Sequence, residues 1–224
     1  MKVILDQDGM LEIARRLKAE CMDYYLFFVL MYRTGVTGAK LLHMDVKDVE
    51  GFITTNFDLL QDELIDEIKN HCINRNPNSA FLCNKYSENR LPRRTIEHWV
   101  TLIGNEVLNT SDFGFKSIQR TFYFEYLKNN NFNFNIVKKL FSSRRMYQAS
   151  LESFLEYLGM TEDEYNTEVL KSNKERSVDY IYYSKVIIEK LYDLVTKSDI
   201  SEAEKLRYTV KTKEILGILR TVEY

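Results

Sequence analysis

Lysine and arginine side chains gather in the middle third of the chain, at spacings that suit phosphate binding. Residues 84–146 hold eleven Lys or Arg against five Asp or Glu, although the whole chain of 224 residues has a net charge of −2. Guanidinium and ammonium groups make charge-assisted hydrogen bonds to phosphate oxygens, and a local basic surface can bind phosphate even on an acidic protein. The candidate phosphate-binding residues are Arg90, Arg93, Arg94, Lys116, Arg120, Arg144 and Arg145.

The other side chains that could do chemistry are scattered. The three cysteines are widely spaced without a CxxC pair, and no histidine has a second one three or four residues away. We therefore expect neither a disulfide framework nor a metal site, and no cofactor. The acidic run "DLLQDELIDEIKN" at 58–70 has the spacing of a solvated helix face. There is no glycine-rich phosphate loop.

The elements that must position the basic residues are mostly helices. Apolar spacing predicts helices over 8–20, with Asp8 as N-cap, and over 22–34, which is apolar nearly all round and ends at Gly35. Further helices are predicted over 38–44, 61–72, 92–108, 115–129 and 135–159, and two helical blocks over 175–197 and 201–222. β-Branched and aromatic residues predict a small sheet near 50–57 and 80–83. The expected fold class is mostly α with a small β-sheet (α+β).

The domain organisation and location follow from composition. No clear boundary precedes residue 160, so we expect one domain over 1–160 and a C-terminal helical extension over 161–224. The longest apolar run, "YLFFVLMY" at 25–32, is too short to span a bilayer, and no secretory signal is visible. These features predict a cytoplasmic protein that does not enter membranes.

Four segments in order resemble the catalytic domain of the tyrosine recombinases, the phage integrase family. They are "LMYRTGVTGAKLLHMDVKDV", "SAFLCNKYSENRLPRRTIEHWV", "FKSIQRTFYFEYL" and "NIVKKLFSSRR". They resemble the family's helix before Thr-Gly-Leu-Arg, its strand and turn before the next helix, its "H-x-L-R-H-T-F-A" helix and its "V-x-x-L-L-G-H-S-S" segment. The resemblance covers residues 8–158 and implies a recombinase-like fold that holds double-stranded DNA.

The family's catalytic residues are missing at the matching positions. The phosphate-holding arginines, the histidines and the tyrosine nucleophile are replaced by Thr37, Lys116, Gln119, Ser143 and Glu152. A register shifted by one residue would keep Arg120 as a clamp but fits less well. Residues 51–68, where the family's general-acid lysine is expected, contain no Lys or Arg. Tyrosine attack on phosphorus needs the guanidinium clamp, the acid and the nucleophile together. The resemblance therefore implies a fold without recombinase activity.

Three functions remain open. The first is a DNA-binding transcriptional regulator, such as a repressor, of a phage or other mobile element. The second is an active recombinase with displaced residues, Tyr147 or Tyr157 acting with Arg120 and Arg33. The third is a protein-interaction module without DNA binding.

The C-terminal extension carries an apolar stripe at helical spacing. The stripe consists of Tyr182, Val186, Ile187 and Leu191. Such a stripe packs in an intramolecular core or against a partner helix. In the family, the segment after the nucleophile often packs on a neighbouring protomer, so the resemblance implies a homo-oligomer formed through the C-terminal helices.

Overall fold

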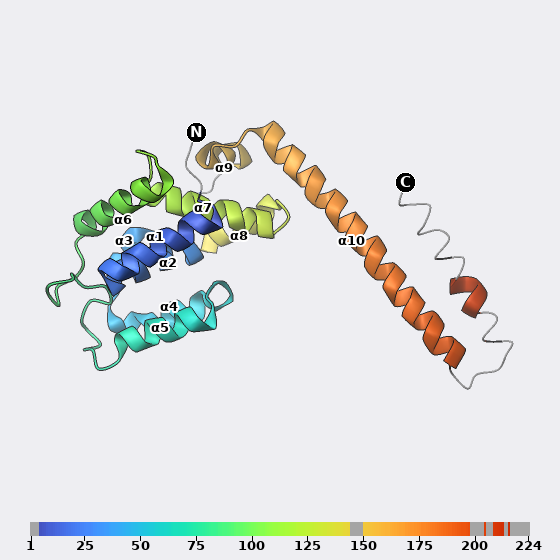
Figure 1. Cartoon of the computed structure of the whole chain (residues 1–224), viewed down its shortest axis with the longest axis horizontal. Coiled ribbons are helices and arrows are strands. Elements are labelled where there is room, and N and C mark those ends of the chain that lie inside the picture. The colour runs from blue at the N-terminus through green and yellow to red at the C-terminus, as the bar shows by residue number, and fades with distance from the viewer. Residues whose placement is uncertain (1–4, 144–149, 198–203, 205–207, 213–214, 216–224) are drawn as a thin grey trace. The chain divides into compact units, whose positions relative to one another are not determined.

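The computed structural model describes residues 5–143, 150–197, 204, 208–212 and 215. The first six helical elements are α1 (Gln7–Glu20), α2 (Met22–Thr34), α3 (Gly38–Leu42), η1 (Val46–Asp48), α4 (Val49–Thr55) and η2 (Phe57–Leu59). They are followed by α5 (Asp62–Cys72), α6 (Arg93–Leu108), α7 (Phe115–Asn129), α8 (Phe134–Ser143), α9 (Leu151–Leu158) and α10 (Glu162–Lys197). Figure 1 shows these elements in chain order. The chain divides into two compact units, Met1–Glu162 and Asp163–Tyr224.

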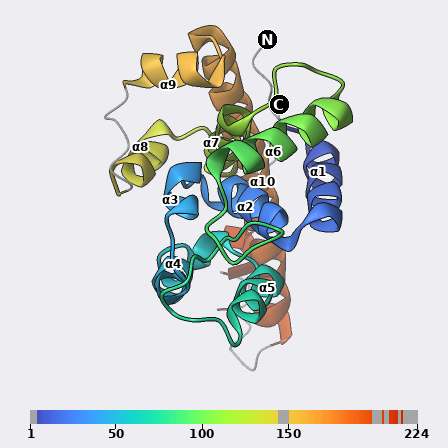
Figure 2. The ribbon, with the colours of Figure 1, turned by 90° about the vertical axis from the view of Figure 1, so that its left-hand side faces the viewer.

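The prediction of a mostly helical chain is confirmed, and α2 is the centre of the first unit. Leu26, Phe27, Phe28 and Leu30 are completely buried. The helix packs against α1, α3, α6 and α7 (Figure 2). A helix that is apolar all round needs neighbours on every side, because each exposed apolar face would cost free energy.

The predicted small sheet is wrong for the described residues, which contain only isolated β-bridges, Asp45 with Ala80 and Cys83 with Arg90. Residues 49–55 form helix α4 instead of a strand. Val49, Phe52 and Ile53 are buried, and their i, i+3, i+4 spacing places them on one helical face. The burial of this stripe outweighs the strand propensity of the β-branched residues around it.

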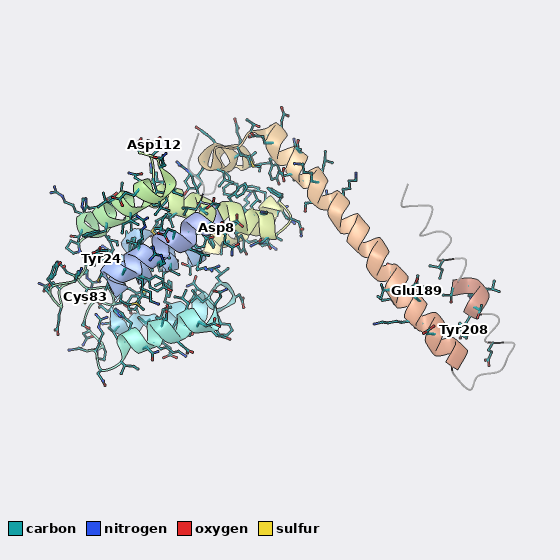
Figure 3. The ribbon with its side chains drawn as sticks, viewed as in Figure 1. Asp8, Tyr24, Cys83, Asp112, Glu189 and Tyr208 are labelled. Atoms are coloured by element: carbon teal, nitrogen blue, oxygen red, sulfur yellow. The ribbon has the colours of Figure 1, made fainter. Side chains whose placement is uncertain are left out.

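The start of α1 also differs from the prediction. Asp6 is the N-cap, and its side chain accepts a hydrogen bond of 2.7 Å from the Gly9 N–H. Asp8 is exposed in the first turn (Figure 3). Both positions place a carboxylate near the positive end of the helix dipole, so the sequence pattern alone does not show which of the two aspartates is the N-cap.

The long segment between α5 and α6 is held by two of its own arginines, Arg75 within the segment and Arg90 to the end of α3 and the residues after it. Arg75 donates hydrogen bonds to the carbonyls of Ala80 and Phe81 and to the Cys83 sulfur. Arg90 donates to the carbonyls of Leu42 and Met44, 2.7 and 3.2 Å away, and to the Asp45 carboxylate. These guanidinium groups bind backbone carbonyls of an irregular segment, and of these the Met44 carbonyl also accepts a bond from the Phe81 N–H.

Asp23 in the first turn of α2 is a third attachment point. Its carboxylate accepts hydrogen bonds from the Cys83 backbone N–H, at 2.6 Å, and from His71 Nε2, at 3.3 Å. Burial acts to raise the pKa of Asp23, but the bonds from His71 and Cys83 outweigh it and hold the pKa below its ordinary value. The charged carboxylate therefore stabilises the folded state.

Replacing Asp23 by Asn should lower the free energy of unfolding by about 1–3 kcal/mol near pH 7, because the charged acceptor is lost. The folded pKa is depressed, so the stabilisation is present above the ordinary value near 4 and is lost as pH falls through the folded pKa. Urea unfolding at pH 7 and pH 3 should show the difference between the variants shrinking at the lower pH. The exposed Asp66→Asn control should match the wild type at pH 7.

The second unit begins with α10, a helix of 36 residues. It includes the predicted block 175–197 and starts earlier than predicted. Of the block predicted over 201–222, residues 204, 208–212 and 215 are helical, and the other residues lie outside the described residues. Within the part of the chain that the structure describes, no helix is long and apolar enough to cross a bilayer.

Candidate nucleic-acid interface

The turn from α2 to α3 is shaped to receive α7. Gly35 has a φ of 64°, and a Cβ added there would lie 2.1 Å from a ring carbon of Phe122. A Cβ on Gly38 would lie 2.9 Å from Phe27 and 3.4 Å from Phe115. Only residues without a side chain let the backbone and the α7 rings approach this closely. The predicted C-terminal cap at Gly35 is present in the structure.

Two side chains of α7 bind the carbonyl of this turn. The Tyr123 hydroxyl donates to the Gly35 oxygen at 3.3 Å, and Gln119 Nε2 lies 3.5 Å from the same oxygen. Thr37 follows two residues later, and its hydroxyl caps α3 by accepting a bond from the Lys40 N–H. Two peptide units span at most about 8 Å. The structure therefore brings Gln119 and the turn containing Thr37 together.

Two basic residues of α7, Lys116 and Arg120, share the face that carries Gln119. Lys116, Gln119, Arg120 and Tyr123 have the i, i+3, i+4, i+7 spacing of one helical face. Lys116 is exposed, and no ion pair neutralises it or Arg120 among the described residues. Two unneutralised cations on one face are the simplest arrangement that attracts a phosphate.

Arg120 is held in place by an aromatic ring from α9. Its guanidinium carbon lies 5.5 Å from the centre of the Tyr157 ring, a cation–π geometry. Its Nε is buried and has no hydrogen-bond partner among the residues that the structure describes. A buried donor without an acceptor costs free energy, and an incoming phosphate oxygen could supply one if the side chain shifts.

Tyr157 itself is poorly suited to attack phosphorus. Burial raises its pKa to about 12, against the opposing effect of the Arg120 charge. The phenol therefore stays protonated at neutral pH, and no general base is hydrogen-bonded to it among the described residues. A nucleophilic oxygen needs such a base or a lowered pKa. The ring acts here as a platform for Arg120.

Arg33, the other arginine of the displaced-residue alternative, lies elsewhere. It lines a small cavity of about 260 Å³ with Tyr32, Phe122 and Tyr126. Phe122 lies about 200° around α7 from Arg120. The structure therefore does not bring Arg33 to the face that carries Arg120.

The remaining candidates divide into four groups. Arg93 pairs with Glu97 at 3.5 Å on the exposed side of α6, and the neighbouring Arg94 is exposed. Arg90 makes the hydrogen bonds that fasten its segment, so a contact of its guanidinium with DNA would compete with them. Glu152 is exposed in the first turn of α9. Two candidates, Arg144 and Arg145, lie outside the described residues, as do Tyr147 and the Ser143 side chain.

Sequence reasoning missed the cluster of Asp23, His71 and Arg75. His71 has no partner at helical spacing, but Asp23 contacts it from 48 residues away. In the sequence, the sign of this cluster is Asp23, a single carboxylate in the first turn of the mostly apolar helix α2. Among the residues that the structure describes, no group of His, Cys, Asp or Glu could hold a metal ion.

No protein-family model, curated protein or solved structure matches this chain. The likeness to the tyrosine recombinases therefore remains a prediction from the four sequence segments.

Proposed function

We propose that this protein binds double-stranded DNA through the α7 face that carries Lys116, Gln119 and Arg120. In this proposal it has a tyrosine-recombinase-like fold without catalytic residues and regulates transcription, as a repressor, in a phage or other mobile element. The observation that carries the proposal is the pair of cations Lys116 and Arg120, which no ion pair neutralises within the described ranges, beside the turn containing Thr37. Phosphate contacts from such cations supply affinity that depends on salt and little on sequence.

A gel-shift experiment with operator-sized duplexes from the neighbouring genome tests this proposal against a protein-interaction module. We expect a retarded complex that weakens as salt rises, because phosphate binding releases counterions. A chain that binds no duplex at low salt and micromolar protein would favour the protein-interaction module.

The displaced-residue recombinase remains the second candidate because Arg120 and Tyr157 are in contact. We expect no covalent adduct with a suicide DNA substrate, since the raised pKa keeps Tyr157 protonated. Tyr157→Phe, which keeps the ring under Arg120, should leave DNA affinity within about twofold, and Tyr147→Phe should do the same. An adduct that disappears in either variant would establish a working nucleophile.

We also propose a homo-oligomer formed through α10. Ile187 and Leu191, one turn apart, are 57% and 53% exposed, so this apolar face has no complete cover. Val186 is half-buried, and the Tyr182 side chain lies outside the described residues. Sedimentation velocity on the whole chain tests the assembly, and a single monomeric species at all concentrations would exclude it.

A further inference from the structure

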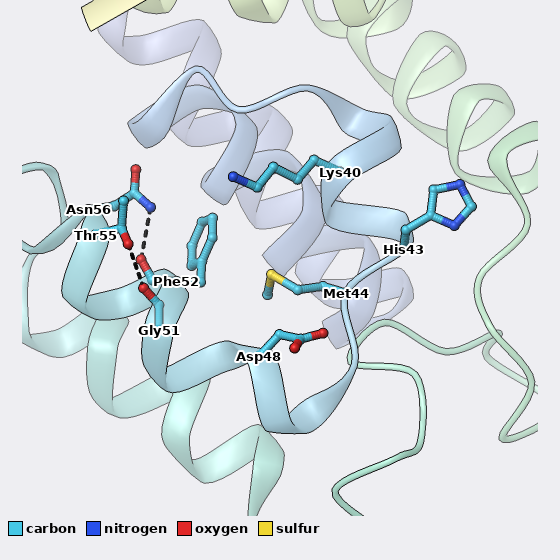
Figure 4. A pocket seen from close by; sticks show the side chains of 8 residues that line it. All are labelled: Lys40, His43, Met44, Asp48, Gly51, Phe52, Thr55 and Asn56. Carbon is cyan, nitrogen blue, oxygen red and sulfur yellow. Dashed lines mark hydrogen bonds between the residues drawn. The ribbon is translucent and has the colours of Figure 1, made fainter. Parts of the chain in front are cut away.

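A cavity of about 390 Å³ lies between α3 and α4, away from the α7 residues described above. Lys40 borders it on one side and Gly51 on the other, with Met44 and Phe52 between them (Figure 4). Both apolar side chains are only 6% exposed, so they form a floor and not a protruding patch. The volume falls at the lower end of the range for small-molecule sites.

The packing of the fold gives no reason for a glycine at Gly51. It lies inside α4, its backbone is not left-handed, and a Cβ added there would meet nothing within 4 Å. A glycine inside a helix costs roughly 0.5–1 kcal/mol relative to alanine. Neither a turn nor close packing requires glycine at this position, but its lack of a side chain keeps the cavity wall open.

Two of the side chains that line the cavity are charged, the Lys40 ammonium and the Asp48 carboxylate, and of these two the carboxylate already holds a hydrogen bond from the chain. The Thr55 hydroxyl donates to the Gly51 carbonyl, and the Asn56 amide donates to the Phe52 carbonyl, as the dashed lines of Figure 4 show. Asp48 accepts a bond from the Asp45 N–H, and the His43 ring points away from the cavity. Lys40 extends over the cavity, and among the described residues it has no ion-pair partner.

We propose that this α3–α4 cavity binds a small organic anion. Its apolar body lies against Met44 and Phe52, and its carboxylate, sulfonate or phosphate group pairs with Lys40. The apolar floor supplies affinity through buried area, and the single cation selects the charge. The inference goes beyond DNA binding and does not depend on it, because none of these residues belongs to the α7 face.

Fluorescence titration with anilinonaphthalene sulfonate, an aromatic anion, tests the proposal on the whole chain without DNA. The wild type should bind one dye per chain. Lys40→Met should weaken binding at least tenfold by removing the charge, and Gly51→Leu should do the same by filling the cavity. Matched controls are Lys69→Met, on the exposed side of α5, and Glu50→Leu, one position from Gly51 and exposed; both should bind like the wild type.

Loss of dye binding can be distinguished from loss of folding. Melting followed by circular dichroism identifies any variant that fails to fold, and Lys40→Met tests the site without adding bulk. Naphthalene sulfonate should displace the dye, whereas inorganic phosphate at the same concentration should not. Equal binding by the wild type, Lys40→Met and Gly51→Leu would overturn the proposal. Complete displacement by inorganic phosphate would overturn the role of the apolar floor.

Discussion

Replacing Gly35 by alanine is expected to lower the free energy of unfolding by about 2–5 kcal/mol. The left-handed backbone at this position costs an alanine about 1–2 kcal/mol. The added Cβ also meets the Phe122 ring, and such overpacking typically costs about 1–3 kcal/mol. Because Tyr123 and Gln119 both bind the Gly35 carbonyl, the change should also weaken the packing of α7 on this turn. Urea unfolding at pH 7 measures the effect.

Two further variants separate the backbone from the steric contribution. Gly51→Ala, the same substitution in open space, should raise stability by about 0.5–1 kcal/mol. Phe122→Leu in the Gly35→Ala background should recover part of the loss, since the smaller side chain makes room for the Cβ. A Gly35→Ala protein as stable as the wild type would contradict the packing of α7 on this turn.

Replacing Lys116 or Arg120 by alanine should weaken DNA binding by about 1–3 kcal/mol if the residue reads a base edge. If it contacts only phosphate, the loss should be similar on specific and random duplexes. Lys116 is exposed, and within the described part of the chain neither residue has an ion pair to break, although the buried Arg120 Nε must shift to reach a phosphate. Fluorescence anisotropy with a labelled duplex at constant salt measures the change.

The matched control is Arg15→Ala on α1. Arg15 is also an arginine, but its side chain is 70% exposed and pairs with Glu12. Removing it changes the net charge by the same amount without touching the α7 face. Binding lost equally in Arg15→Ala would show that net charge and not this face determines affinity.

The helices around the α2–α3 turn could be predicted from local pattern. The apolar run of α2, its end at Gly35 and the bounds of α7 all follow from spacing and capping residues within one segment. The helix over residues 49–55 could not be predicted in this way. The strand propensity of these residues favours a strand, whereas their apolar spacing favours a helix, and burial against the core decides for the helix.

The site was predictable only where its parts share an element. The face formed by Lys116, Gln119 and Arg120 follows from helical spacing alone. The hydrogen bonds of Arg90 to carbonyls 46 and 48 residues away depend on the tertiary arrangement, and so does the contact of Tyr157 with Arg120. Sequence spacing alone does not reveal that Arg90 also bonds the backbone at the end of α3, or that the Tyr157 ring lies against Arg120.

The salt dependence of duplex affinity for the wild type and the Lys116→Ala/Arg120→Ala double variant tests the proposed function most directly. Each phosphate contact contributes close to one unit to the slope of log affinity against log salt. We predict that the wild type binds duplex DNA with a clear salt dependence and that the double variant has a slope smaller by about two units. Identical slopes for the two proteins, or no binding by the wild type at low salt, would contradict DNA binding through the α7 face.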